Sequence, residues 1–479
     1  MRSPAWFTTV ASIASCAMLA SMALAQSAPR AAWALDATVA EDEGEPEPAA
    51  EEPELPISAD PARNTEILRI AAVLRLSRRE DSPGRVELVQ RMTAKGASSV
   101  EALLDLLEAG RVPKTDPQDG RQVLSDPQRE LVLGALGASD RGQVARAAEQ
   151  RLADATTAGA ARPSALALGA VGGALELERF LREWKTQSGR DLPDLEHRDW
   201  RKVFQLLLRR SPDAFGVAER YWRDASEARR RALVEASGQL GDPAALRTLA
   251  SILENDQGDL ATLSIGQIPR IGRSYDSDLD ERMCESLRMR LEHPNANLRQ
   301  LTLQALGELR DRSTMGLCID LLESDDVGTR SIALWALRRA SGVELEGKKT
   351  TWERWFAEQE RTLARAPRSI LPKLESKDPM VVVEGLRELG LLRVERPQVA
   401  RWIEPLLERR EPGLRVQACI ALGELDDRSS APALFELAED ADSRVSAAAR
   451  AALRKLTGRE YGVQENTAVL DARTPPARS

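Results

Sequence analysis

The sequence predicts an all-α fold, an α-solenoid of about ten antiparallel helix pairs. The first observation is a glycine that returns about every 33 residues, each time after an apolar run. The second is the helical spacing of the apolar residues in those runs. The third is an aromatic content of only 4%, which suits close packing of alanine-rich and leucine-rich helices. The glycines are Gly137, Gly169, Gly241, Gly272, Gly307, Gly342, Gly390, Gly423 and Gly458.

The steps between these glycines explain where the pattern is interrupted. The step of 72 residues after Gly169 fits two periods with one masked glycine, and the step of 48 residues after Gly342 fits one period plus an insert. The insert is expected at residues 343–366, where Trp352 begins a short extra helix, and a normal second helix is expected to resume at Ser369.

Residues 411–441 illustrate the expected plan of one unit, which is helix, short turn and helix. Each helix has an apolar stripe at spacings of three, four or seven residues, the period of one helical face. The turn occupies residues 423–428. The stripes consist of Leu414, Ala418, Ala421 and Leu422, and then of Ala433, Leu434, Leu437 and Ala438.

The two ends of the chain read differently from the repeats. Residues 1–25 are expected to be a signal peptide, because Arg2 precedes an apolar run that ends in the A-x-A site before Gln26. Two alternatives stay open: lipoprotein processing at Cys16, and retention of the 19-residue run as a membrane anchor. Residues 26–60 are expected to be a disordered acidic linker, residues 61–462 the solenoid, and residues 463–479 a disordered tail. The protein is therefore expected in the periplasm, in the cell envelope or outside the cell.

Charge argues against nucleic acid as a partner. The chain has a net charge of −8, of which residues 1–56 contribute −7 through nine acidic and two basic side chains. The remaining chain therefore has a net charge of −1, whereas nucleic-acid binding needs a clearly basic face. We expect a protein partner, and contact with a membrane only through an uncleaved or lipidated N-terminus.

Catalytic, cofactor-binding and metal-binding residues are expected to be absent. The chain has two histidines, His197 and His293, and they are far apart in the sequence. A catalytic triad or a histidine metal site needs more ligands that converge. Cys284, Cys318 and Cys419 each lie within an apolar helical run, so we expect buried thiols rather than a disulfide.

Two sets of residues remain as candidates for binding. Trp352 and Trp355 are three residues apart and share one helix face, which fits either a weak partner-docking patch or the packing of the insert onto the repeats. Packing is the favoured interpretation. Arginines that recur at the repeat spacing are expected to form a structural ladder, and these are Arg299, Arg330, Arg415 and Arg444.

The repeat units resemble HEAT repeats, in particular the subtype named after the phycobilin lyases. That subtype favours Asp-x-x-x-Arg-x-x-Ala-x-x-Ala-Leu-Gly-x-Leu-x-Asp. The pattern is found at Asp326 to Leu337 and at Arg415 to Asp426, and the resemblance is strongest over residues 226–458. It implies a right-handed superhelix with the second helix of each pair on the concave side. A related enzyme family, the di-iron deoxyhypusine hydroxylases, uses His-Glu pairs as iron ligands, and this chain has none.

The sequence therefore predicts a non-enzymatic, exported scaffold that binds a protein partner on its concave face. Two alternatives stay open. One is a lyase-like or chaperone-like factor that acts on a cofactor or client protein, and the other is a cell-envelope spacer anchored by its N-terminus.

Overall fold

The computed structural model describes residues 60–77, 83–113, 122–182, 194–211, 213–256 and 258–458. All of them fall within one compact unit, Ile57–Ser479. The predicted signal peptide (1–25), the linker up to residue 59 and the tail (463–479) lie outside the described residues. Within the described part of the chain, no helix combines the length and the apolar character needed to cross a bilayer.

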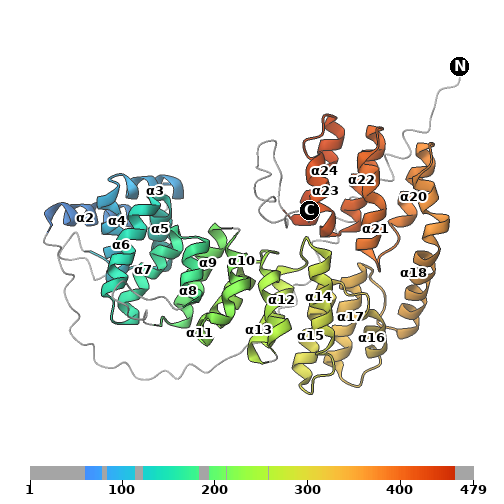
Figure 1. The fold of residues 1–479 in the computed structure, drawn as a ribbon, viewed down its shortest axis with the longest axis horizontal. Helices are drawn as coiled ribbons and strands as arrows, with labels where there is room; N and C mark the ends of the chain where they lie inside the picture. The colour runs from blue at the N-terminus through green and yellow to red at the C-terminus, as the bar shows by residue number, and fades with distance from the viewer. Residues whose placement is uncertain are drawn as a thin grey trace. The chain divides into compact units, whose positions relative to one another are not determined.

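The described residues are almost entirely helical, and the chain folds as the predicted all-α solenoid (Figure 1). The first half comprises α2 Pro61–Leu76, α3 Arg85–Thr93, α4 Ala97–Ala109, α5 Asp126–Ala138, α6 Arg141–Asp154, α7 Ala158–Val171, α8 Ala174–Leu181, α9 His197–Arg210, α10 Ala214–Tyr221, α11 Glu227–Leu240 and α12 Ala245–Asn255. The second half comprises α13 Asp259–Ile271, α14 Ser277–Arg288, α15 Ala296–Leu309, α16 Met315–Leu321, α17 Val327–Ser341, α18 Lys349–Ser369, α19 Leu371–Leu374, α20 Pro379–Leu389, α21 Arg396–Ile403, α22 Pro412–Leu425, α23 Ala431–Leu437 and α24 Ser443–Thr457. Short 3₁₀ turns lie at Trp222–Asp224, Glu404–Glu408 and Arg428–Ser430.

The helices are arranged in two layers. The first helices of successive units pack side by side, from α5 through α7, α9, α11, α13 and α15 to α17. The second helices α8, α10, α12 and α14 pack on one another in the same way. Farther along the chain, α20, α22 and α24 continue the first kind of layer. Each unit thus buries its apolar stripe against its neighbours, as a solenoid requires.

One small element departs from the expectation that the array has no strands. Arg111–Val112 (β1) pairs with Gln122–Val123 (β2) as a two-stranded antiparallel ladder between α4 and α5. The backbone N–H of Leu124 also donates to the carbonyl of Gly110 at 2.8 Å. The pairing satisfies backbone groups where the chain reverses direction. A ladder two residues long has no hydrophobic periodicity, so sequence patterning misses it.

Aspartate side chains begin many of the helices. They accept a hydrogen bond from a backbone N–H of the first turn, which would otherwise have no partner. The caps of this kind are Asp60 of α2, Asp140 of α6, Asp276 of α14, Asp326 of α17, Asp378 of α20 and Asp442 of α24. The repeated Asp of the sequence pattern is therefore a helix start signal.

The periodic glycines fall into two physical classes. Gly307 lies within α15 at a close helix crossing, where an added Cβ would lie 2.8 Å from both Cα and Cβ of Ala336 on α17. Gly342 instead ends α17 with a φ of 70°, a left-handed conformation that glycine adopts without strain. One class sets how closely neighbouring units approach, and the other ends the first helix of a unit.

The apolar core is divided into three clusters of buried side chains. The largest extends from Ile70 to Leu309, a small one joins α15–α17 to the start of α18, and the third extends from Ala366 to Leu456. The first break therefore falls at α15, before the insert, and the second falls within α18.

The insert differs from the sequence expectation in length. The extra helix is not short: α18 runs for 21 residues and ends only at Ser369, so it takes over the position where a second helix was expected to resume. Residues 349–366 contain neither glycine nor proline, so nothing in them ends a helix. Pro367 falls in the last turn, and the helix ends two residues later.

Candidate functional site

The tryptophan pair of α18 contributes to the core rather than to an exposed patch. Trp352 is fully buried, and Trp355 is half-buried. Their ring centroids are 5.7 Å apart with the planes at 79°, an edge-to-face contact. Trp352 belongs to the small cluster with Met315, Cys318 and Leu337. The structure thus supports packing of the insert, and the buried face of Trp352 offers no surface to a partner.

Three of the four ladder arginines make the same kind of contact, each with its own pair of backbone carbonyls. Each donates from Nη1 to the carbonyls six and five residues before it, in the turn that precedes its own helix. Arg299 reaches the carbonyls of His293 and Pro294 at 2.8 and 2.9 Å, and Arg415 reaches those of Arg409 and Arg410 at 2.9 and 3.2 Å. Arg330 bonds the carbonyls of Ser324 and Asp325 in the same way.

The fourth arginine behaves differently. Arg444 bonds the carboxylate of Asp442, two residues earlier, at 2.8 and 3.1 Å, and its side chain is 72% exposed. Arg415 also reaches the carboxylate of Asp440 at 3.1 Å, with only 16% of its side chain exposed. The repeated arginine therefore joins successive units at Arg299, Arg330 and Arg415 but not at Arg444.

This difference gives a testable prediction. Arg415→Ala removes hydrogen bonds from the partly buried carbonyl of Arg409, the exposed carbonyl of Arg410 and the carboxylate of Asp440, so we expect a loss of about 1–3 kcal/mol in the free energy of unfolding. Arg444→Ala is the matched control and should leave stability unchanged, because an exposed pair contributes little. Urea unfolding followed by circular dichroism measures both, and equal losses would contradict a special role for Arg415.

The three described cysteines are buried and unpaired. Burial and the nearby Asp311 raise the pKa of Cys318 to about 12. Burial and Asp440 raise the pKa of Cys419 to about 11, and burial raises the pKa of Cys284 well above its usual value. Because the thiolate is the reactive form, these thiols are poor nucleophiles in the folded protein.

Thiol protection follows as a second prediction. Iodoacetamide at about pH 8, near the usual thiol pKa, should leave Cys284, Cys318 and Cys419 unmodified in the native protein. All three should react after denaturation in urea. Mass spectrometry of tryptic peptides reads each site separately, and rapid native labelling of one of them would place that thiol on an accessible surface.

The two histidines lie on separate elements and have ordinary partners. The Nε2 of His197, at the start of α9, lies 3.0 Å from a carboxylate oxygen of Glu235 on α11. The Nδ1 of His293 accepts from the backbone N–H of Asn295 at 3.1 Å. Among the described residues, no group of three or more His, Cys, Asp or Glu side chains is arranged to hold a metal ion.

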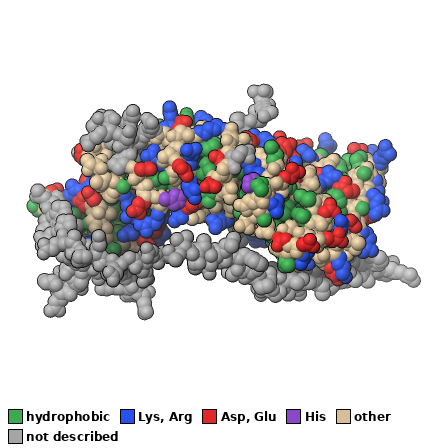
Figure 2. Space-filling model, turned by 90° about the horizontal axis from the view of Figure 1, so that it is seen from below, with side chains coloured by type: hydrophobic (Ala, Val, Ile, Leu, Met, Phe, Trp, Pro, Cys, Tyr) green, Lys and Arg blue, Asp and Glu red, His purple; other side chains and the backbone are tan. Residues whose placement is uncertain are grey.

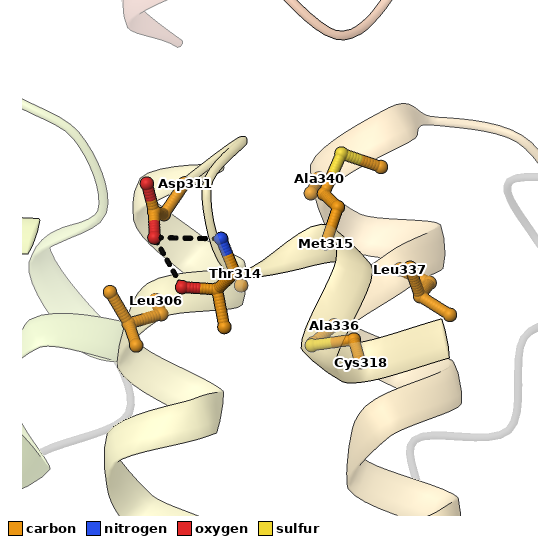
Figure 3. Close-up of a pocket in the computed structure, with 9 residues that line it drawn as sticks. Leu306, Asp311, Thr314, Met315, Cys318, Ala336, Leu337 and Ala340 are labelled. Carbon is orange, nitrogen blue, oxygen red and sulfur yellow. Dashed lines mark hydrogen bonds between the residues drawn. The ribbon is translucent and has the colours of Figure 1, made fainter. Parts of the chain in front are cut away.

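A small cavity lies inside one repeat interface (Figure 3). It is lined by Leu306, Cys318 and Leu337 among others, and its volume of about 10 Å³ is close to the minimum for one water molecule. At its rim the carboxylate of Asp311 accepts from the backbone N–H of Thr314 at 3.1 Å and from its hydroxyl, as Figure 3 shows. The cavity is a packing gap rather than a ligand site.

A larger, polar pocket of about 110 Å³ lies where two stretches of the array meet. We call α13–α17 (259–341) the middle segment and α19–α24 (371–457) the C-terminal segment. The pocket is lined on one side by α14 and the turns that follow α13 and α15. On the other side it is lined by residues 393–397, which comprise the turn before α21 and the first two residues of that helix. Its charged lining consists of Arg273, Asp280, Glu281, Arg310, Asp311, Arg312, Arg393, Glu395 and Arg396.

Sequence analysis missed these charged residues. Arg310 and Asp426 are 116 residues apart, and no local spacing relates them. A possible signal was that each directly follows a repeat helix, in Leu309-Arg310-Asp311 and Leu425-Asp426-Asp427, where other units carry glycine. An arginine and an aspartate at such positions bear a conformational cost that calls for a structural reason.

Comparisons with known proteins agree with repeats of this kind. Residues 367–454 match the family described as HEAT repeats. No curated protein matches the chain.

The solved structures that match the chain have low sequence identity and low TM-scores. An engineered protein from the Northeast Structural Genomics Consortium is 12% identical over 82% of this chain and 100% of its own, with a TM-score of 0.27. A second engineered protein is 15% identical over 44% and 96%, with a TM-score of 0.18. The karyopherin Kap121p, bound to the extreme C-terminus of the protein phosphatase Cdc14p, is 11% identical over 81% and 45%, with a TM-score of 0.31.

The family match falls on helix pairs that the structure describes. The matched region, 367–454, covers the C-terminal segment, whose helix pairs α20–α21 and α22–α23 follow the same plan as the pairs before the insert. Residues 367–454 are therefore HEAT repeats, at the C-terminal end of an all-α solenoid.

Proposed function

We propose that the chain is a non-enzymatic, exported scaffold of the phycobilin-lyase-like HEAT subtype, and that it binds a protein partner on the face formed by its second helices. The observation that carries the proposal is the two-layered array itself. Successive second helices form one layer, so their outward side chains create a long surface to which many units contribute. Interfaces of this kind draw most of their affinity from a few anchor residues.

Exposed apolar side chains on second helices are the candidate anchors. Leu175 on α8 is 62% exposed, and Leu317 on α16 is 40% exposed. Elsewhere the charges are mixed: Figure 2 shows basic and acidic side chains interspersed over the face in view. A balanced surface favours a protein partner over a polyanion. The buried, protonated thiols described above favour binding over covalent catalysis.

The proposal is tested by using the purified protein to capture a partner from an extract of its native host. The wild type is compared with variants whose replaced side chains are similarly exposed. Leu175→Glu and Leu317→Glu place a charge on second helices, and Ile420→Glu, at a side chain 43% exposed on the first helix α22, is the control. We expect the first two variants to lose a partner that the wild type and the control retain. Equal retention by all three would contradict binding on the second-helix face. Conversion of a retained client or cofactor by the wild type would contradict the non-enzymatic assignment.

Export needs a separate test. N-terminal sequencing of the protein from its native host should give Gln26 as the first residue, because the A-x-A site ends at Ala25. A lipid-modified Cys16 would indicate a lipoprotein, and an intact Met1 would indicate a retained anchor or a protein that is not exported.

A further inference from the structure

The middle and C-terminal segments are joined by turns rather than by packed helices. The C-terminal segment packs its helices into its own apolar cluster, whereas the helices of the middle segment are divided between the largest cluster and the small one. Helix α18 leads from one segment to the other (Figure 1). Contacts between the segments come from the ends of helices and the turns after them. Two apolar side chains also take part, since Tyr275 packs against the C-terminal cluster and Val394 belongs to the small cluster around Trp352.

Three successive first helices of the middle segment end at this junction. Each C-terminus meets a group from the C-terminal segment. Arg428 donates to the carbonyls of Ile271 and Arg273, at 3.4 and 2.7 Å, just past the end of α13. Arg396 donates to the carbonyl of Ser341, the last residue of α17, at 2.7 Å. The last carbonyls of a helix lack partners within it and carry partial negative charge, so they attract a guanidinium.

The helix between these two, α15, ends with the most unusual contact. Arg310 follows α15 with a φ of 61°, and Asp426 follows α22 with a φ of 56°. They are the two non-glycine residues with positive φ in the described chain. The Arg310 guanidinium donates to both the carboxylate and the backbone carbonyl of Asp426. Gly241, Gly342 and Gly458 occupy the same position after α11, α17 and α24.

Further charged contacts surround this pair. Arg273 lies 2.8 Å from the carboxylate of Asp427, which is fully buried, and Arg312 lies 2.8 Å from that of Glu395. Burial and the nearby Arg310 lower the pKa of Arg396 to about 9. The junction therefore holds several guanidinium groups close together around the polar pocket, and the buried ones, Arg273 and Arg396, regain hydration once the turns separate.

We propose that this junction is a polar latch: the Arg310–Asp426 pair and the arginine caps hold the two segments closed, and the segments separate about α18 when those contacts break. Opening breaks the apolar contacts of Tyr275 and Val394 and otherwise leaves the C-terminal cluster intact. Salt screens the buried pairs little, but the carboxylate side chain of Asp426 is 42% exposed, so the Arg310–Asp426 pair weakens with ionic strength whereas helix packing does not. This inference is independent of the proposed partner binding.

Glycine substitutions give the sharpest test. Arg310→Gly and Asp426→Gly remove the pair, yet glycine suits both backbone conformations, so the double variant should fold. Distances are measured by spin labels on Met289→Cys and Met380→Cys in the purified full-length protein with Cys16→Ser. Met289 lies in the middle segment and is 78% exposed, and Met380 lies in the C-terminal segment and is 74% exposed. The described native thiols are buried, so they should not take up the label. Arg330→Ala is the control, because it removes an arginine–carbonyl contact within the middle segment.

We expect the wild type and Arg330→Ala to give one narrow distribution of label distances at low salt. The double glycine variant should show a longer, broader population with unchanged helix content. Wild type at about 1 M NaCl, where the Debye length is about 3 Å, should shift in the same direction. An unchanged distance in the double variant overturns the proposal. If that variant loses helix content, the wild-type salt series decides, and a distance insensitive to salt overturns the proposal.

Discussion

Trp352→Ala is expected to destabilise the protein by about 3–5 kcal/mol, the usual loss when a fully buried large aromatic side chain is removed. The indole is fully buried in the cluster that joins α15–α17 to α18. Its removal leaves a cavity in the smallest of the three clusters, where few neighbouring side chains could move in to fill it. Urea unfolding monitored by circular dichroism measures the loss.

Two companion variants separate the possible causes. Trp352→Phe keeps most of the apolar contact, and the indole N–H has no hydrogen-bond partner in the described part of the chain, so this variant should lose much less than Trp352→Ala. Trp355→Ala should also lose less, because Trp355 is half-buried. The two rings are in contact, so the loss of the double alanine variant should differ from the sum of the single losses. Unchanged stability together with loss of a partner would instead indicate a docking patch.

Gly307→Ala is expected to destabilise the protein by about 1–3 kcal/mol, as overpacking of a tight interface does. The new Cβ would lie 2.8 Å from the Cα of Ala336, a backbone atom that can move only if α17 shifts, and 3.0 Å from the ring of Trp335. Alanine is otherwise the better helix former, so without this contact the same change would stabilise α15.

Gly266→Ala provides the matched control. Gly266 lies within α13, and nothing lies within 4 Å of the position where its Cβ would be. There the change should stabilise the protein by about 0.5–1 kcal/mol. Thermal unfolding of the two variants tests opposite signs for the same substitution. A gain for both variants would show that the contact between α15 and α17 can relax without cost.

The repeated units could be predicted because their signals are local. Asp326 begins a helix, Gly342 ends one, and the apolar stripe between them gives the helical period, all within about 17 residues. The shared role of Arg299, Arg330 and Arg415 was accessible for the same reason, since each arginine bonds carbonyls five and six residues away. Arg444 has the same spacing but a different partner, so spacing alone did not fix the contact.

The junction could not be predicted because its contacts join residues far apart in the chain. Arg428 and Ile271 are 157 residues apart, and Arg396 and Ser341 are 55 apart. Their meeting depends on the path that α18 gives to the chain. The length of that helix was itself underestimated, because residues 349–366 contain no glycine or proline and the helix continues until the turn that holds Pro367. Patterning therefore describes each unit well and says little about how distant units meet.

The division of the apolar core into three clusters has a consequence for how the protein melts. Two-state unfolding requires every part of a chain to lose its structure together. Here the clusters around Leu168, Trp352 and Leu422 share few side chains, so heat should disrupt them at separate temperatures. Calorimetry is then expected to give more than one transition, with a total calorimetric enthalpy larger than the van't Hoff enthalpy of any single step. Trp352→Ala would shift mainly the transition of its own cluster, which would assign that transition to a defined part of the array.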